Sequence, residues 1–239
     1  MPRPGRPRLP WEAFTVGILR PLLAIVVRHR WRGREHVPAH GGVIIAANHL
    51  SWSDPLFLSL FLYNSGRWPV FLAKSGIFEV PLLGPFLRQV KQIPVYRDRS
   101  DAALSLRDAE KGLREGAAVI VYPEGTCTRD PDLWPMAAKT GVARLAIKTG
   151  VPVIPVAHWG AQDVLPYGDK LPRLFPRKTF KVLAGPPVDL SAYRDRPLTA
   201  STLRAATEEV MKAITHQLSE IRHEKPPAEP YRPSADRDR

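Results

Sequence analysis

The sequence has 239 residues, of which 44% are hydrophobic and 24% charged, so its bulk has the composition of a folded protein with room for one sizeable α/β domain. Its net charge of +12 calls for an anionic partner, for which nucleic acid, anionic lipid headgroups and phosphorylated substrates are the candidates. The single cysteine, Cys127, excludes an intramolecular disulfide and a cysteine-based zinc site, and fits a reducing cytoplasmic environment.

The N-terminal part divides into two segments. Residues 1–9 are rich in Pro and Arg, and we expect a disordered tail. Residues 10–31 form an apolar, aromatic stretch between cationic flanks, too interrupted by Arg20 and Pro21 to predict a transmembrane helix. No small-residue cleavage site follows it, which argues against a signal peptide. We predict a helix lying in a membrane interface; an ordinary core helix is the alternative.

Alternating strand and helix patterns occupy residues 32–224. Six apolar runs rich in Val and Ile predict buried strands at 43–47, 70–73, 93–96, 118–122, 153–157 and 180–184. Helical patterns lie between them, at 55–63, from Ser100 to Gly116, at 137–149 and at 199–222. The alternation predicts one α/β domain whose central, mostly parallel sheet is flanked by helices. Residues 225–239 are predicted to be a second disordered tail.

A polar segment from Asn48 to Pro55 directly follows the first predicted strand, where open α/β sheets place ligands and catalysts. His49 and Asp54 would point about 140° apart on a continuous helix, but the serines and the Asp54-Pro55 pair predict a turn. A turn would let the Asp54 carboxylate bind one imidazole nitrogen and leave the other free to accept a proton. The alternative is that Asp54 only caps a helix and His49 is a buried structural histidine.

Three further segments carry weaker signals. The loop from Pro123 to Arg129 follows another predicted strand and combines a glycine, two hydroxyls and a guanidinium, which suit a phosphate, although a polar surface loop has the same composition. Arg97 directly follows the strand at 93–96. Prolines bracket the apolar strand within 151–157.

Taken together and in this order, these segments resemble the glycerolipid acyltransferase family typified by 1-acylglycerol-3-phosphate acyltransferase. That family carries an Asn-His-x-x-x-x-Asp block, an Arg after a short strand, a Pro-Glu-Gly-Thr block and a Val-Pro-x-Ile-Pro-Val block. The matching segments are 48–54, 93–97, 123–129 and 151–156. The resemblance covers about residues 30–190. It implies an acyl thioester donor (acyl-CoA or acyl carrier protein), a lyso-glycerophospholipid acceptor, direct acyl transfer and no cofactor.

The resemblance also implies residue roles. His49 would be the general base, and Asp54 would orient it. The substrate-binding set would be Lys74, Arg97, Glu124, Gly125, Thr126 and Arg129, with the acceptor phosphate on Arg97 and Lys74. Arg129 lies two places after the family's position, which weakens its assignment. A thioester is already activated, so one base and a stabilised oxyanion suffice chemically.

Several rival interpretations follow from the same residues. Cys127 would act as an acyl-accepting nucleophile in a two-step mechanism. The chain could instead be a non-catalytic lipid-binding protein, or acylate a glycosylated lipid. Nucleic-acid binding is suggested only by charge, since no helix-turn-helix, zinc-finger or RNA-recognition signature occurs. We find no residues at metal-ligand spacing and interpret the other histidines as structural or solvated. We expect a peripheral or monotopic protein on the anionic, cytoplasmic face of a membrane, of unspecified oligomeric state.

Overall fold

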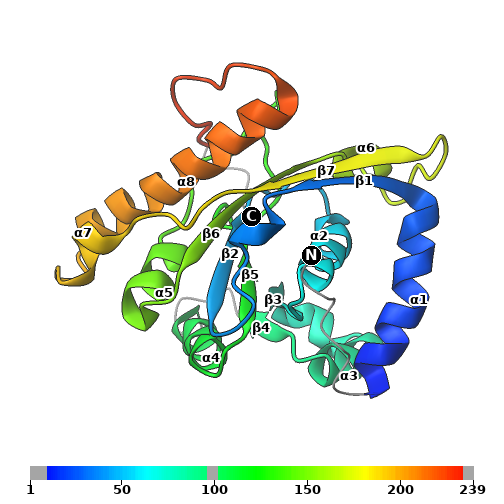
Figure 1. The fold of residues 1–239 in the computed structure, drawn as a ribbon, viewed down its shortest axis with the longest axis horizontal. Helices are drawn as coiled ribbons and strands as arrows, with labels where there is room; N and C mark the ends of the chain where they lie inside the picture. Colours follow the sequence, from blue (N-terminus) through cyan, green and yellow to red (C-terminus); the bar gives the residue numbers. More distant parts are fainter. Residues whose placement is uncertain (1–9, 96–101, 234–239) are drawn as a thin grey trace.

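The computed structural model describes residues 10–95 and 102–233. A seven-stranded sheet with the order β1-β7-β6-β2-β5-β3-β4 forms its centre (Figure 1). All neighbouring strands are parallel except β6 and β7. The strands are β1 (Val27–Arg32), β2 (Val43–Ala47), β3 (Pro69–Lys74), β4 (Ile93–Val95), β5 (Ala118–Val121), β6 (Val153–Trp159) and β7 (Lys178–Ala184). The predicted α/β fold with a mostly parallel sheet is confirmed.

The described helices precede, connect or follow these strands in the chain and cover both faces of the sheet. They are α1 (Pro10–Val26), α2 (Asp54–Asn64), α3 (Leu83–Gln89), α4 (Ala102–Arg114), α5 (Gly141–Thr149), α6 (Ala161–Val164), α7 (Ser191–Arg194) and α8 (Ala200–Arg222), with short 3-10 helices η1 (Arg34–His36) and η2 (Ser75–Glu79). Helix α2 lies on one face, and α4, α5 and α8 lie on the other (Figure 1).

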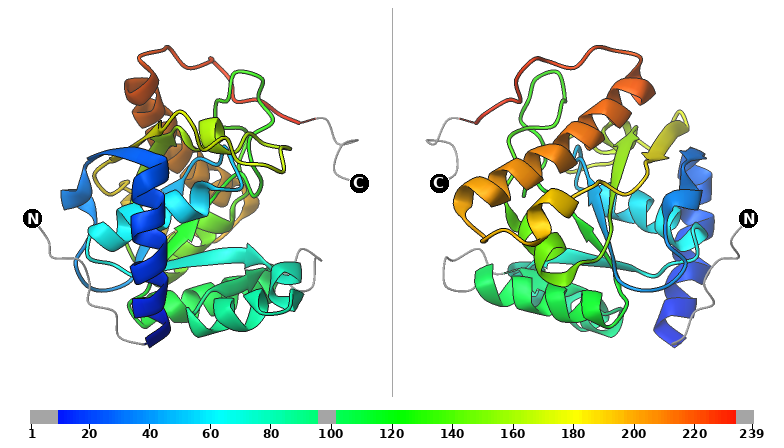
Figure 2. Two further views of the ribbon diagram at one scale, coloured as in Figure 1. Left: turned by 90° about the vertical axis from the view of Figure 1, so that its right-hand side faces the viewer. Right: turned by 60° about the vertical axis from the view of Figure 1, so that its left-hand side comes forward.

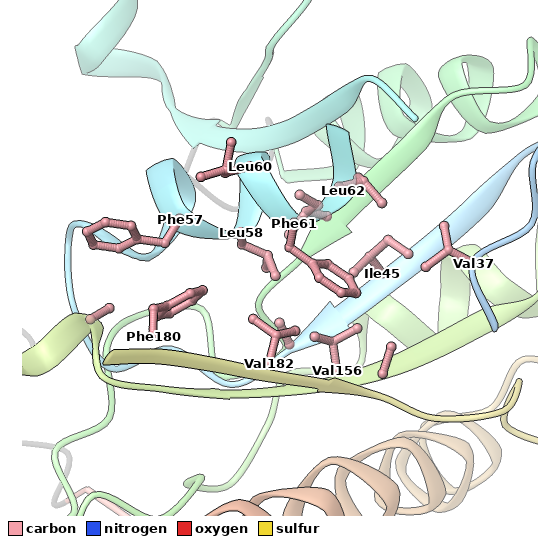
Figure 3. Packing of buried hydrophobic residues seen from close by; sticks show 14 of the residues in the cluster. Val37, Ile45, Phe57, Leu58, Leu60, Phe61, Leu62, Val156, Phe180 and Val182 are labelled. Atoms are coloured by element: carbon pink, nitrogen blue, oxygen red, sulfur yellow. The ribbon is translucent and has the colours of Figure 1, made fainter. Parts of the chain in front are cut away.

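The two larger of the three buried hydrophobic clusters in the described residues result from the alternation of side chains along the buried strands. In β2, Ile45 and its alternate neighbours pack with α2, whereas Ile44 and Ala46 pack with α4, α5 and α8. Figure 3 shows Phe57 of α2 above Phe180 of β7, with ring centroids 5.1 Å apart, and Phe61 of α2 above Val182 of the same strand. Fully burying such a side chain contributes about 1.5–3 kcal/mol. This packing fixes the start of α2, which carries Asp54, relative to the end of β2.

The N-terminal segment differs from its prediction. Residues 10–31 do not form one helix, because the chain leaves α1 at Val26 and enters β1, an edge strand paired in parallel with β7. Val27 and Trp31 of β1 face the core, while Arg28 and the other basic residues between them are exposed. Helix α1 stands at the margin of the molecule (Figure 2). Its Leu23 is buried and packs into the core.

Smaller differences concern the chain ends and element limits. Residues 1–9 and 234–239 lie outside the described residues, so those parts of the predicted tails stay predictions. Residues 225–233, also predicted to be disordered, follow a defined path in which the Tyr231 carbonyl accepts a hydrogen bond from the Ala137 N–H at 2.9 Å. Strand β6 runs two residues beyond its predicted end, to Trp159. Helix α5 begins at Gly141 instead of residue 137.

Candidate active site

The candidate site lies where two neighbouring parallel strands end. The loop of residues 48–53 follows β2, the loop of residues 122–129 follows β5, and the strands pair from Val43 with Ala118 to Ala46 with Val121. A side-chain clamp fixes the first loop to β6 on its other side. The Asn48 amide donates to the His158 carbonyl at 3.1 Å and accepts from the His158 N–H at 2.9 Å. Both loops are therefore anchored directly to the centre of the sheet.

His49 and Asp54 meet in the turn that the sequence predicted. The distance from His49 Nδ1 to Asp54 Oδ2 is 2.8 Å. The same oxygen accepts the N–H groups of Leu50 at 2.6 Å and Ser51 at 2.9 Å, and the Asp54 side chain is fully buried. Three donors around one oxygen favour the carboxylate, which places the imidazole proton on Nδ1 and leaves Nε2 as a proton acceptor. His49 also lines a cavity large enough for a substrate, so the turn fixes the orientation of a candidate general base at the cavity surface.

Glu124 stabilises this turn by accepting backbone hydrogen bonds. One carboxylate oxygen accepts the backbone N–H of His49 at 3.0 Å, and the other accepts the N–H of Met136 at 2.9 Å. Burial raises the pKa of Glu124 to about 8, although these two hydrogen bonds act in the opposite direction. Glu124 does not line the cavity, which differs from its predicted place in the substrate-binding set. Its position indicates that it holds the His49 backbone.

Tyr122 and Cys127 contact the His49 ring. The rings of Tyr122 and His49 stack with centroids 4.1 Å apart. Cys127 Sγ lies 3.7 Å from Nδ1 and 3.6 Å from Nε2, and such equal distances place the sulfur along the lone pair of neither nitrogen. Burial, and then the nearby Asp54 and Glu124, raise the pKa of the Cys127 thiol. A protonated, poorly aligned thiol does not fit the activated nucleophile of the two-step interpretation.

A cavity of about 880 Å³ extends from His49 between α1, α2, β3, η2 and α3. Its walls are mostly apolar, with residues such as Leu60, Phe71, Leu87 and Val90, and its polar groups near His49 include Thr126, Lys139 and Thr140. Among the described residues, Arg20 and Lys139 are the cationic side chains in its lining. Gly125 has φ +76, and a Cβ there would come within 3.2–3.3 Å of the Lys139 side chain, so the two lie in contact.

The other predicted site residues are placed unequally. Gly125 and Thr126 line the cavity, whereas Arg129 is half-buried and outside the lining. Lys74 is the last residue of β3, and its side chain lies outside the described part of the structure. Arg97 also lies outside the described residues. In the described chain, the structure thus places His49, Gly125 and Thr126 around one space, and Asp54 reaches it only through its hydrogen bond to His49.

Two site residues were missed by the sequence analysis, Lys139 and His158. No local pattern distinguishes Lys139 in the sequence, and only the fold brings its side chain to Gly125. His158 was grouped with the structural or solvated histidines, because no cluster at metal-ligand spacing accompanies it in the sequence. Its Nε2 lies 2.7 Å from the Asn48 carbonyl and 3.6 Å from Asp54 Oδ2, and burial lowers its pKa. It is a neutral imidazole that donates to the carbonyl of Asn48 and borders the Asp54 carboxylate.

Within residues 10–95 and 102–233, no group of three or more His, Cys, Asp or Glu side chains is placed to hold a metal ion. In the same residues, none of the helices combines the length and the apolar character that crossing a membrane requires.

Comparison with known proteins adds sequence and fold relatives. A family model described as Acyltransferase matches residues 28–159, more than half of the chain. A Borreliella burgdorferi protein named 1-acyl-sn-glycerol-3-phosphate acyltransferase is 36% identical over 133 residues, which are 55% of this chain and only 51% of that protein. A Pseudomonas aeruginosa protein of the same name is 29% identical over 222 residues, 90% of this chain and 80% of that protein.

The fold resembles a solved structure. The crystal structure of the 1-acyl-sn-glycerophosphate acyltransferase of Thermotoga maritima superposes with a TM-score of 0.66 at 22% sequence identity, covering 90% of this chain and 81% of that one. At this identity the likeness concerns the fold.

Proposed function

This chain belongs to the Acyltransferase family, and from that membership we propose that it transfers a fatty acyl group from an acyl thioester to the free hydroxyl of a lyso-glycerophospholipid. The proposed acceptor is 1-acylglycerol-3-phosphate, which would give phosphatidic acid. The names of the Borreliella and Pseudomonas relatives support this acceptor. The thioester carrier is coenzyme A or acyl carrier protein.

The observation that carries the proposal is the His49–Asp54 pair at the polar end of an apolar cavity. In the proposed reaction, His49 Nε2 removes the proton of the acceptor hydroxyl as its oxygen attacks the thioester carbon. The C–S bond then breaks, and the thiolate leaves with the proton that the imidazolium returns. Asp54, held by two backbone N–H groups, stabilises the imidazolium and fixes its tautomer.

The cavity suits a lipid chain better than a polar substrate. Its volume of about 880 Å³ lies near the upper end of the roughly 300–1,000 Å³ typical of small-molecule sites. Apolar walls remove an acyl chain from water at a gain of roughly 25 cal/mol per Å². We propose that this space holds an acyl chain with its carbonyl beside His49. The Gly125 N–H is bonded to the Tyr122 carbonyl at 3.0 Å, so it is a poor choice as oxyanion donor.

The acceptor phosphate would bind cations near the polar end. Lys139 lies against Gly125 in the cavity lining, next to Thr126. An ammonium and a hydroxyl at one surface are suitable donors for phosphate oxygens. We propose that Lys139 joins Arg97 and Lys74, which the family resemblance assigned to the phosphate.

We further propose that α1 holds the protein on the anionic, cytoplasmic face of a membrane. Ile18, Leu22 and Ile25 are half or more exposed on this helix, and Arg20 is exposed beside them. Apolar side chains next to basic ones suit the interface of an anionic bilayer. Both the acceptor and the product are bilayer lipids, so docking there brings the site to its substrate.

The proposed function is tested with purified protein, a panel of acyl-CoA and acyl-carrier-protein donors, and lyso-lipid acceptors that include lysophosphatidate, zwitterionic lysophospholipids and a glycosylated lipid. Mass spectrometry identifies the product. We expect phosphatidic acid to dominate, and equal acylation of neutral acceptors would contradict the phosphate assignment. Binding of lipid without any product would favour the non-catalytic interpretation.

The base is tested in the same assay. His49→Ala should lower turnover by about 10²–10⁴-fold, the usual contribution of a general base, with the thermal unfolding temperature retained. Incubation with donor alone, followed by intact-mass spectrometry, should show no acyl adduct. An adduct on Cys127 that disappears in Cys127→Ser would replace direct transfer by a two-step reaction.

A further inference from the structure

The segment of residues 165–177 between α6 and β7, called here the α6–β7 loop, exposes an unusual set of side chains. Leu171 and Phe175 are each 80% exposed, and Tyr167 and Leu174 are exposed between and beside them. Scattered exposed apolar residues are ordinary, but a cluster of large ones marks an interaction surface. No part of the proposed reaction uses this loop.

Both ends of the α6–β7 loop are fastened. At its start, the Ser51 hydroxyl donates to the Leu165 carbonyl at 2.6 Å, and Trp52 meets Tyr167 edge-on with ring centroids 5.6 Å apart. At its end, the Arg177 guanidinium donates to the carbonyls of Ala24 and Val27. The loop therefore joins the turn that carries His49 to the C-terminal end of α1. Figures 1 and 2 show the loop projecting next to that end.

The exposed apolar surface continues beyond the loop toward the cavity. Trp52 is 56% exposed and Leu56 is 44% exposed, and both line the cavity. On the other side of the Arg177 contacts, Ile25 is the most exposed of the large apolar residues near the end of α1. A flat apolar partner resting on the loop and α1 would thus also reach the entrance of the cavity.

The charges around this surface favour an anionic partner. Residues 163–178 contain four basic side chains, Lys170, Arg173, Arg177 and Lys178, against Asp163 and Asp169. The positive charge of the loop also acts on His29 of β1. Burial lowers the pKa of His29 most, and the guanidiniums of Arg177 and of Arg20 on α1 lower it further. Exposed apolar side chains that alternate with basic residues, of which Arg173 is paired with Asp169 at 2.9 Å, match a bilayer of anionic lipid, where acyl chains lie next to charged headgroups.

We propose that the α6–β7 loop is a second membrane anchor, which inserts Leu171 and Phe175 into an anionic lipid bilayer beside α1 and turns the entrance of the cavity toward the membrane. The inference deepens the proposed function, on which it rests for a substrate that resides in the bilayer. Its insertion step, however, requires no acyl transfer.

The test uses fluorescence from a single labelled position in the full chain. Because the one native cysteine is buried, Cys127→Ser combined with Leu171→Cys carries an environment-sensitive fluorophore only at the loop tip. Vesicles contain phosphatidylcholine alone or with phosphatidylglycerol, with bromine atoms on the acyl chains as quenchers. The matched control places the label by Arg204→Cys at an exposed position in the first turns of α8, and Figure 1 shows the start of α8 on the opposite side of the molecule from the loop.

We expect anionic vesicles to quench the label at position 171 and leave the label at 204 unchanged. Leu171→Ser with Phe175→Ser should lower vesicle partitioning by roughly a hundredfold, about tenfold for each apolar side chain withdrawn, with turnover on a short-chain soluble acceptor unchanged.

Equal quenching at 171 and 204, or none at 171 in vesicle-bound protein, overturns the anchor. Quenching that is as strong in neutral vesicles overturns the choice of anionic lipid. Burial of the label by dimerisation without vesicles assigns the surface to a second copy instead. Since quenching is read without turnover, an inactive protein that is still quenched would refute the proposed function and not the anchor.

Discussion

The turn that carries His49 and the wall of the cavity near α1 are built in opposite ways. In the turn, a fully buried Asp54 oxygen has three hydrogen-bonding partners, and a carboxylate oxygen of Glu124 accepts the backbone N–H of His49. In the wall, α1 reaches the core through Leu23, and Ile18, Leu22 and Ile25 face outward. The His49–Asp54 pair is thus preorganised by the folded core, whereas the wall near α1 leaves large apolar side chains exposed, which suits the lipid partner proposed above.

The largest expected effect is in the turn. Asp54→Asn keeps the shape of the side chain but removes the charge that stabilises the imidazolium, and an amide can turn its NH₂ toward His49. We expect turnover to fall on the order of 10³–10⁴-fold, the size seen for such a change in a serine protease triad. Steady-state kinetics and thermal unfolding are measured together. A variant that loses stability and keeps its turnover would show that Asp54 serves only the helix start.

In the wall, substitution should change selectivity more than rate. Ala73 of β3 lines the cavity, so Ala73→Phe fills part of the space proposed for the acyl chain. We expect kcat/KM to fall about tenfold for a long-chain thioester relative to a short-chain one, since one pocket contact is worth about 1–3 kcal/mol. Ala200→Phe, at the exposed start of α8, is the matched control. Equal loss for both chain lengths would place the acyl chain elsewhere.

Lys139 lies at the boundary between the two regions, and its effect should be confined to the acceptor. Lys139→Met is expected to raise the apparent KM for lysophosphatidate by about tenfold to a hundredfold, because one charge-assisted contact contributes about 1.5–3 kcal/mol, and to leave the KM for the thioester within about twofold. Lys139→Arg should recover most of the loss, and Lys212→Met on α8 controls for net charge. A larger effect on the thioester would assign Lys139 to the donor.

The sequence predicted the turn better than the wall, for physical reasons. Short buried strands and a His–Asp pair ahead of Pro55 are local patterns, and the structure contains both. Strand β1 was missed because an edge strand with exposed Arg28 and Arg30 has the same composition as the cationic flank of an interfacial helix. Lys139 and His158 reach the site only through tertiary packing, on a loop and at a strand end that no local pattern distinguishes.

The smallest expected effect on turnover is that of substituting Glu124, whose carboxylate accepts the His49 N–H and so stabilises the turn. This role is tested by the pH dependence of stability. The pKa of Glu124 is raised by burial from 4.5 to about 8. Because the folded-state pKa exceeds the unfolded one, the folded protein holds an extra proton between these values, and this stabilising contribution, complete below pH 4.5, declines as pH rises to about 8. Glu124→Gln has no proton to lose. The free energy of unfolding of the wild-type protein minus that of the variant should therefore fall by up to about 1.4 kcal/mol per pH unit through this window.

Urea unfolding at several pH values measures that difference, and turnover should change only a few-fold, since the amide oxygen still accepts the His49 N–H. A difference that stays constant with pH would mean that the two backbone N–H groups keep Glu124 ionised, and that the turn is braced by a buried charge.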